Sequence, residues 1–173
     1  MARLDGFSEP NASLPLRFAT YSGRQTSGLT LIIAGGLLVA TANGSRSWVA
    51  LVGSVAHVLG WAILPAPAWR RFWATGPGLL SVWLLLVGPQ LAWLVSVPLA
   101  LWYLVRRRPG WAYPTLLIPI AVGVIAIAVA GPFAARVPLL LLTFASAVGA
   151  AWLARVLAAR TGASISGNTA SDR

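Results

Sequence analysis

The 173-residue chain contains no cysteine and no lysine, and its three acidic residues, Asp5, Glu9 and Asp172, all lie in the terminal segments. Its one histidine is His57. These absences exclude thiol–disulfide chemistry, catalysis by paired carboxylates and metal sites built from clustered histidines. Proton- or sodium-coupled transport commonly uses acidic residues inside the membrane, and this chain has none there. We therefore expect no enzyme activity, no metal and no cofactor.

Apolar sequence, in contrast, is abundant. The chain is 58% hydrophobic and only 9% charged, whereas about a quarter of the residues in a soluble domain are charged. The chain is long enough for one compact helical domain, because each membrane span needs about 20 residues. The composition therefore predicts a polytopic, all-α integral membrane bundle.

Turn and helix-breaking residues divide the apolar sequence into candidate spans. Asn43-Gly44 favours a tight turn, and Pro65-Ala66-Pro67 and Gly88-Pro89 interrupt helices. A single transmembrane domain is predicted over residues 26–160, after an N-terminal arm of residues 1–25 and before a disordered, polar tail of residues 161–173. The six predicted spans are residues 28–42, 48–64, 73–87, 90–105, 115–134 and 137–158.

A five-span alternative joins the third and fourth segments into one long kinked helix, residues 78–105. That helix would be about 42 Å long at 1.5 Å per residue, well beyond a hydrocarbon core of about 30 Å. With six spans, eleven arginines lie on one side of the membrane and only Arg46 and Arg136 on the other; with five spans the split is six against seven. Because positive residues are enriched on the cytoplasmic side, we predict six spans with both termini cytoplasmic.

Aromatic residues flank the arginine clusters. Indole and phenol rings next to arginines are typical of the membrane interface, where guanidinium groups reach lipid phosphates. This pattern is compatible with ordinary topology signals and also with a specific site for an anionic lipid or a phosphorylated ligand. The basic residues border apolar runs, so nucleic acid is not an expected partner. The residues predicted to contact anionic headgroups are Arg70, Arg71, Arg106, Arg107 and Arg108.

His57 lies near the middle of the second predicted span, where an ionisable residue is a functional candidate. On a helix it shares a face with Gly53, Ser54, Gly60 and Trp61. Three interpretations are open: a ligand pocket, an axial ligand of a b-type haem, or a neutral histidine bonded across a helix interface. No second histidine or methionine-rich face accompanies it, which favours the interhelical bond.

Small residues recur at helical spacing in several spans. Such residues let helices approach closely in a membrane, where no hydrophobic effect drives them together. The predicted packing glycines are Gly36, Gly53, Gly60 and Gly149.

Two functions fit this sequence. The first is a non-catalytic accessory or assembly subunit that packs against other integral membrane proteins; it predicts loss of function on enlarging the packing glycines, with His57→Ala tolerated. The second is a small permease, or the substrate-binding membrane component of a transporter, for an uncharged or aromatic solute; it predicts that His57→Ala and Trp61→Ala abolish uptake without unfolding. Arginine without lysine, with abundant alanine, glycine and proline, indicates a bacterium with a GC-rich genome and hence a plasma-membrane location. The candidate polar site is Ser54, His57, Trp61, Trp93 and Ser96.

Overall fold

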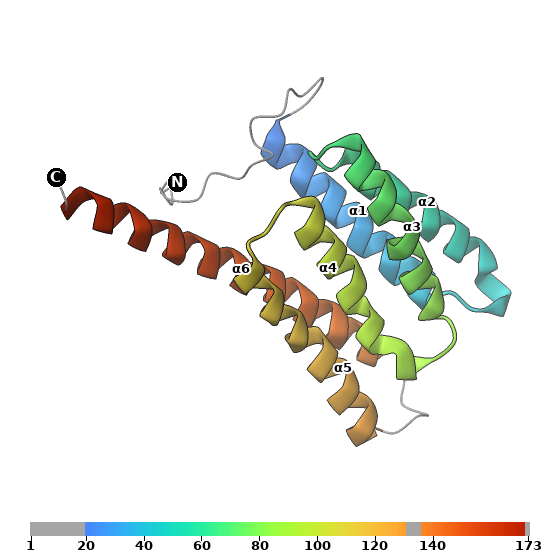
Figure 1. The fold of residues 1–173 in the computed structure, drawn as a ribbon. Helices are drawn as coiled ribbons and strands as arrows, with labels where there is room; N and C mark the ends of the chain where they lie inside the picture. Colours follow the sequence, from blue (N-terminus) through green and yellow to red (C-terminus); the bar gives the residue numbers. More distant parts are fainter. Residues whose placement is uncertain (1–19, 131–135, 172–173) are drawn as a thin grey trace.

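The computed structural model describes residues 20–130 and 136–171, and within these ranges its regular secondary structure is all helical. Six α-helices and three short 3₁₀ helices cover almost all of the described chain (Figure 1). In order they are α1 (Tyr21–Thr41), η1 (Gly44–Arg46), α2 (Ser47–Ile63), α3 (Ala68–Leu84), η2 (Pro89–Val95), α4 (Ser96–Val105), η3 (Gly110–Leu116), α5 (Leu117–Ala130) and α6 (Arg136–Ser171).

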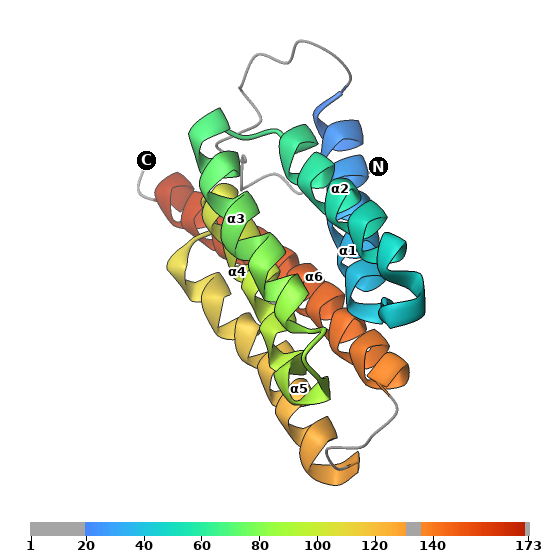
Figure 2. The ribbon, with the colours of Figure 1, turned by 90° about the vertical axis from the view of Figure 1, so that its right-hand side faces the viewer.

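The helices form a bundle in which the chain direction reverses from each α-helix to the next (Figures 1 and 2). One end of the bundle gathers the start of α1, the connection from α2 to α3 and the connection from α4 to α5. The opposite end holds the connections from α1 to α2 and from α3 to α4. At the first end, α6 continues past the other helices (Figure 1).

The structure contradicts the alternative of one long helix over residues 78–105. α3 ends at Leu84, tight turns follow through Val87, and Pro89 begins η2. Proline has no N–H group to continue a helical ladder, so the chain reverses here. α4 then returns beside α3, as a separate helix.

Within residues 20–130 and 136–171, three helical segments are long and apolar enough to cross a membrane: Gly44–Ile63, Gly110–Val129 and Val137–Leu157. Pro89–Val105 is also apolar but has only 17 residues. Seven of these residues form a 3₁₀ helix, which rises about 2.0 Å per residue instead of 1.5 Å, so the segment extends about 29 Å. This length is close to the thickness of a hydrocarbon core of about 30 Å.

The first helix begins inside the predicted N-terminal arm. Thr20 caps α1, because its hydroxyl accepts a hydrogen bond of 3.1 Å from the Gly23 N–H. Residues 21–25 are therefore helical, whereas residues 1–19 lie outside the described chain.

The last helix differs from the predicted disordered tail. α6 has 36 residues and keeps residues 161–171 helical. No proline follows Pro138 in the sequence, so every later residue retains the N–H that a helix needs. Residues 131–134, the end of the fifth predicted span, lie outside the described residues.

α1 and α2 pack backbone against backbone through glycines. A Cβ atom on Gly35 would lie 2.5 Å from the carbonyl oxygen of Gly53, and one on Gly60 would lie 2.7 Å from that of Gly28. Neither position has room for a methyl group, so this pair of helices requires glycine at both crossings. Close approach through small residues is a common way for helices to associate in membranes.

The other two predicted packing glycines have different surroundings. A Cβ on Gly36 would lie 3.3 Å from the ring of Phe144, so Gly36 contacts α6 instead of α2. A Cβ on Gly149 would meet no atom within 4 Å, so Gly149 does not pack against a described helix of this chain. Sequence reasoning missed Gly28 and Gly35, although their spacing of seven residues, two helical turns, places them on one face of α1.

Candidate functional site

His57 is completely buried in α2, where its ring faces α1. Its Nδ1 lies 3.0 Å from the carbonyl oxygen of Ile32, and its Nε2 lies 3.1 Å from the indole nitrogen of Trp61. A carbonyl only accepts and an indole N–H only donates, so Nδ1 carries the proton and Nε2 accepts. The ring is therefore the neutral tautomer, with both nitrogens bonded. A haem iron would need a free ring nitrogen, and Trp61 occupies the lone pair that Nε2 would offer.

Local sequence explains how this pair forms. Trp61 follows His57 by four residues, one helical turn, so their side chains meet on one face of α2. The backbone of α3 covers the pair at Gly78, where a Cβ would lie 3.1 Å from the Trp61 indole nitrogen and 3.3 Å from His57 Nε2. Gly78 thus lets α3 close over the two rings, a role that the sequence pattern did not reveal.

The remaining residues of the predicted polar site do not join this pair. Ser54 accepts a hydrogen bond of 3.0 Å from the indole N–H of Trp83 in α3. Ser96 donates to the carbonyl of Trp93 within its own turn, at 2.8 Å. The Trp93 backbone packs against Gly123 of α5. The five predicted residues therefore belong to three separate clusters.

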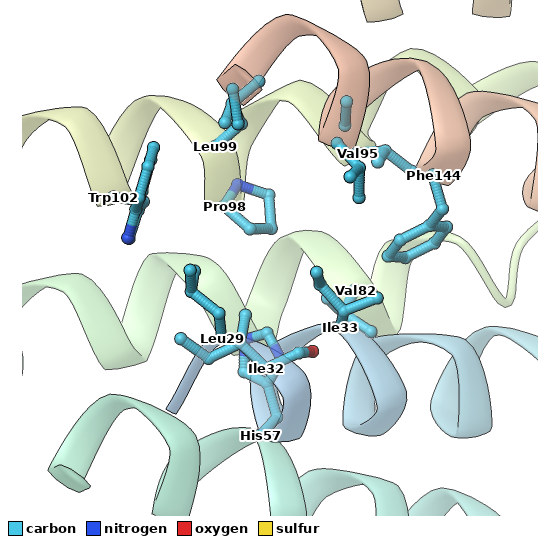
Figure 3. A pocket seen from close by; sticks show the side chains of 13 residues that line it. Leu29, Ile32, Ile33, His57, Val82, Val95, Pro98, Leu99, Trp102 and Phe144 are labelled. Carbon is cyan, nitrogen blue, oxygen red and sulfur yellow. The ribbon is translucent and has the colours of Figure 1, made fainter. Parts of the chain in front are cut away.

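A cavity of about 130 Å³ lies between helices α1–α3 and helices α4 and α6 (Figure 3). His57 contributes to its wall, and the other lining side chains are apolar or aromatic. The cavity is partly open to the outside of the bundle. The lining includes Leu29, Ile32 and Val82 on one side and Leu99, Trp102 and Phe144 on the other.

α4 ends in a turn that separates three consecutive arginines. Arg107 adopts a left-handed conformation with φ of 53°, and the Arg108 N–H bonds to the carbonyl of Tyr103 at 3.0 Å. This is the Schellman arrangement, which satisfies the last carbonyls of a helix. The turn buries Arg106 and Arg108, which are 7% and 6% exposed, and leaves Arg107 in contact with solvent.

The two buried guanidinium groups stack on one indole ring. The Cζ atoms of Arg106 and Arg108 lie 4.8 and 5.7 Å from the ring centroid of Trp102. Burial, together with the positive charges of Arg108 and Arg155, lowers the pKa of Arg106 to about 9. Burial also lowers the pKa of Arg108. This concentration of positive charge attracts anions.

Other arginines lie at the same end of the bundle. The Arg24 side chain donates to the carbonyl of Ile63 at 2.9 Å, and that of Arg70 donates to the carbonyl of Leu104 at 3.2 Å. Both carbonyls belong to helix C-termini, which are partly negative and favour cations. We call this end the arginine end; it comprises Arg24, Arg70, Arg71, Arg106, Arg107, Arg108 and Arg155.

Comparisons of the chain with protein-family models, curated proteins and solved structures found no significant match. No family therefore supplies functional residues for this chain. Three structural features bear on its function: the His57–Trp61 pair, the cavity between the two groups of helices, and the arginine end.

Proposed function

We propose that this chain is a non-catalytic integral membrane protein and an accessory or assembly subunit of a larger membrane complex. One observation carries the proposal. Among the described residues, the buried hydroxyls and the imidazole are all used in bonds within the chain, which leaves the core suited to packing and without a free nucleophile, base or proton carrier. These bonds include His57 with Ile32 and Trp61, Ser81 with Gly78, Tyr103 with Thr115, and Thr143 with Leu139.

A six-span topology is part of this proposal. It is supported by the alternating direction of the six α-helices and by the 29 Å estimated above for Pro89–Val105 from its helical geometry. The arginine end holds seven arginines, whereas η1, which contains Arg46, lies at the opposite end of the bundle. The positive-inside rule then puts the arginine end and both termini in the cytoplasm of a bacterium. Anionic lipid headgroups would be the partners of the arginine end.

Single cysteines can test this orientation, because the natural chain has none. Gly44 and Gly110 lie at opposite ends of the bundle, and an added Cβ would meet no atom within 4 Å at either position. In intact spheroplasts we expect a membrane-impermeant maleimide to label Gly44→Cys, and to label Gly110→Cys only after lysis. Labelling of Gly110→Cys alone in intact cells would reverse the topology, and equal labelling of both would contradict six spans.

The subunit role is tested by crosslinking in native membranes. We expect a photo-reactive residue at exposed positions on several helices, namely Leu51, Val55, Ile125 and Trp152, to capture the same integral membrane protein from at least one helix face. That protein should also co-purify at constant stoichiometry in a mild detergent. The matched control is Ala50, which is 5% exposed and should capture nothing. Recovery of the chain alone, with crosslinks only to lipid, would overturn the subunit role.

A permease or substrate-binding component for an uncharged or aromatic solute is the second candidate, and the cavity favours it. The five residues of the polar site predicted from the sequence do not lie together. Of these five, His57 alone lines the cavity. If this candidate is right, filling the cavity should abolish uptake into proteoliposomes while leaving the fold intact. In a subunit without transport activity, the same change should leave assembly unaffected.

A further inference from the structure

A groove of about 830 Å³, open to the outside of the bundle, lies between α2 and the first half of α3. It begins at the arginine end, where α2 ends and α3 starts (Figure 1). Among the described residues that line it, Arg71 alone is charged. Val58 and Ala62 line it from α2, and Trp73 and Pro77 line it from α3. The groove thus combines one cation with walls that are mainly apolar.

The two consecutive arginines at the start of α3 face different neighbours. Arg70 donates to the carbonyl of Leu104, near the end of α4, whereas Arg71 donates to the carbonyl of Ala62, near the end of α2. A guanidinium group has five N–H donors. The bond to Ala62 uses one of the five on Arg71, so this side chain can also bind an acceptor in the groove.

Positive charge is concentrated around Arg71. Arg24 donates to the carbonyl of Ile63, the residue after Ala62. Burial and the positive charge of Arg24 both lower the pKa of Arg71, because two cations at this distance repel each other. Residues 20–171 contain no aspartate or glutamate, so the described chain offers Arg71 no carboxylate. An anion bound beside Arg71 would offset this repulsion.

The groove extends from the arginine end toward the middle of the bundle. Pro77 follows Arg71 by six residues, about 9 Å along α3, whereas half of a hydrocarbon core is about 15 Å thick. Trp73 is 68% exposed, and exposed indole rings are typical of the membrane interface. A Cβ added at Gly76 would meet no atom within 4 Å, so the chain leaves space there for an apolar group.

We propose that this groove binds one anionic phospholipid of the cytoplasmic leaflet. Its phosphate accepts hydrogen bonds from the Arg71 guanidinium, a geometry that arginine matches well, and one acyl chain lies along Val58 and Pro77. A soluble phosphate would leave the apolar walls uncovered, and an uncharged lipid would leave Arg71 without an anion. The choice of leaflet rests on the topology proposed above, whereas the contacts rest on the groove itself.

Native mass spectrometry of the purified full-length protein in a mild detergent tests the site. The probes are phosphatidylglycerol and phosphatidylcholine with identical acyl chains, and glycerol 3-phosphate, which carries the charge without the chains. We expect one phosphatidylglycerol per chain at saturation, bound about fivefold tighter than phosphatidylcholine, which is the contribution of about one arginine near an anionic surface. Glycerol 3-phosphate should show no saturable binding. These comparisons use the natural protein and require no variant to fold.

Two variants, each with a matched control, then locate the lipid. Arg71→Gln keeps a donor for the Ala62 carbonyl and removes the charge, so it should weaken phosphatidylglycerol about tenfold. Arg46→Gln removes the same charge from the opposite end of the bundle and should leave the affinity unchanged. Ala62→Phe places a ring in the groove and should abolish binding. Ala145→Phe adds the same ring at an exposed position on α6 and should leave binding unchanged.

Five results would overturn the proposal. They are an absence of saturation at one lipid per chain, equal affinity for the two lipids, glycerol 3-phosphate binding as tight as that of phosphatidylglycerol, equal effects of Arg71→Gln and Arg46→Gln, and unchanged binding in Ala62→Phe. Thermal unfolding confirms that each variant is folded before its affinity is interpreted. Binding in detergent depends neither on a protein partner nor on which end is cytoplasmic. The labelling and crosslinking experiments described above can therefore fail while this lipid still binds, and the reverse.

Discussion

Replacing Gly35 with alanine should force α1 away from α2 and strongly destabilise the bundle. The added Cβ would lie 2.5 Å from both the carbonyl oxygen of Gly53 and the backbone nitrogen of His57. These are backbone atoms, so they cannot rotate away as a side chain could, and the two helices must move apart. We expect a loss of about 3 kcal/mol or more in the free energy of unfolding, at the upper end of overpacking effects. Unfolding in mixed micelles and gel filtration would measure it.

Gly149→Ala is the control, and we expect its effect on the free energy of unfolding to have the opposite sign. Nothing lies within 4 Å of the added Cβ there, and alanine favours a helix over glycine by up to about 1 kcal/mol. Gly149→Ala should therefore be as stable as the natural protein or more stable. Equal stability of Gly35→Ala and Gly149→Ala would show that the backbone contact between α1 and α2 is absent from the folded protein.

His57→Ala should also destabilise the protein strongly. The change removes a fully buried ring, deletes the bonds to Ile32 and Trp61, and leaves the Trp61 indole N–H without an acceptor. We expect a loss of about 3 kcal/mol from the enlarged void and the unbonded donor. This result differs from the expectation drawn from the sequence, in which an accessory subunit tolerates the change. Equilibrium unfolding followed by tryptophan fluorescence would measure it.

A double-mutant cycle separates the hydrogen bond from the packing. Trp61→Phe removes the indole donor and keeps an aromatic ring, so its effect should shrink when His57 is already alanine. The two changes should couple by about 1 kcal/mol, as expected for groups in direct contact. Additive effects, or a His57→Ala variant as stable as the natural protein, would contradict the structural role that we assign to the imidazole.

Local features of the sequence predicted the helical class and the main breaks between helices. Apolar composition indicated the class, and Gly88-Pro89 marked the point where the chain reverses between α3 and α4. The proline effect is local, because it depends on one missing N–H. The hairpin of α1 and α2 could also be recognised from the turn residues that close it.

Contacts between distant segments could not be predicted in this way. The partner of His57 is a carbonyl 25 residues away, and every residue has a carbonyl, so no residue type identifies it. The cavity walls include Val82, Trp102 and Phe144 from three different helices, whose rotation about their axes depends on packing. The five residues of the predicted polar site contact three different sets of neighbours for the same reason, because residues that are close in the sequence can face different neighbouring helices.

The continuous α6 sets how far the chain reaches from the bilayer. Its apolar part ends at Leu157, and the helix continues to Ser171, which adds about 21 Å at 1.5 Å per residue. In the topology that we propose, this extension lies in the cytoplasm and exceeds the Debye length of about 8 Å at physiological salt. Its last turn is therefore outside the electrostatic field of the headgroups. A fluorophore attached there would report the pH of the bulk cytoplasm, whereas one at Gly110 would report that of the membrane surface.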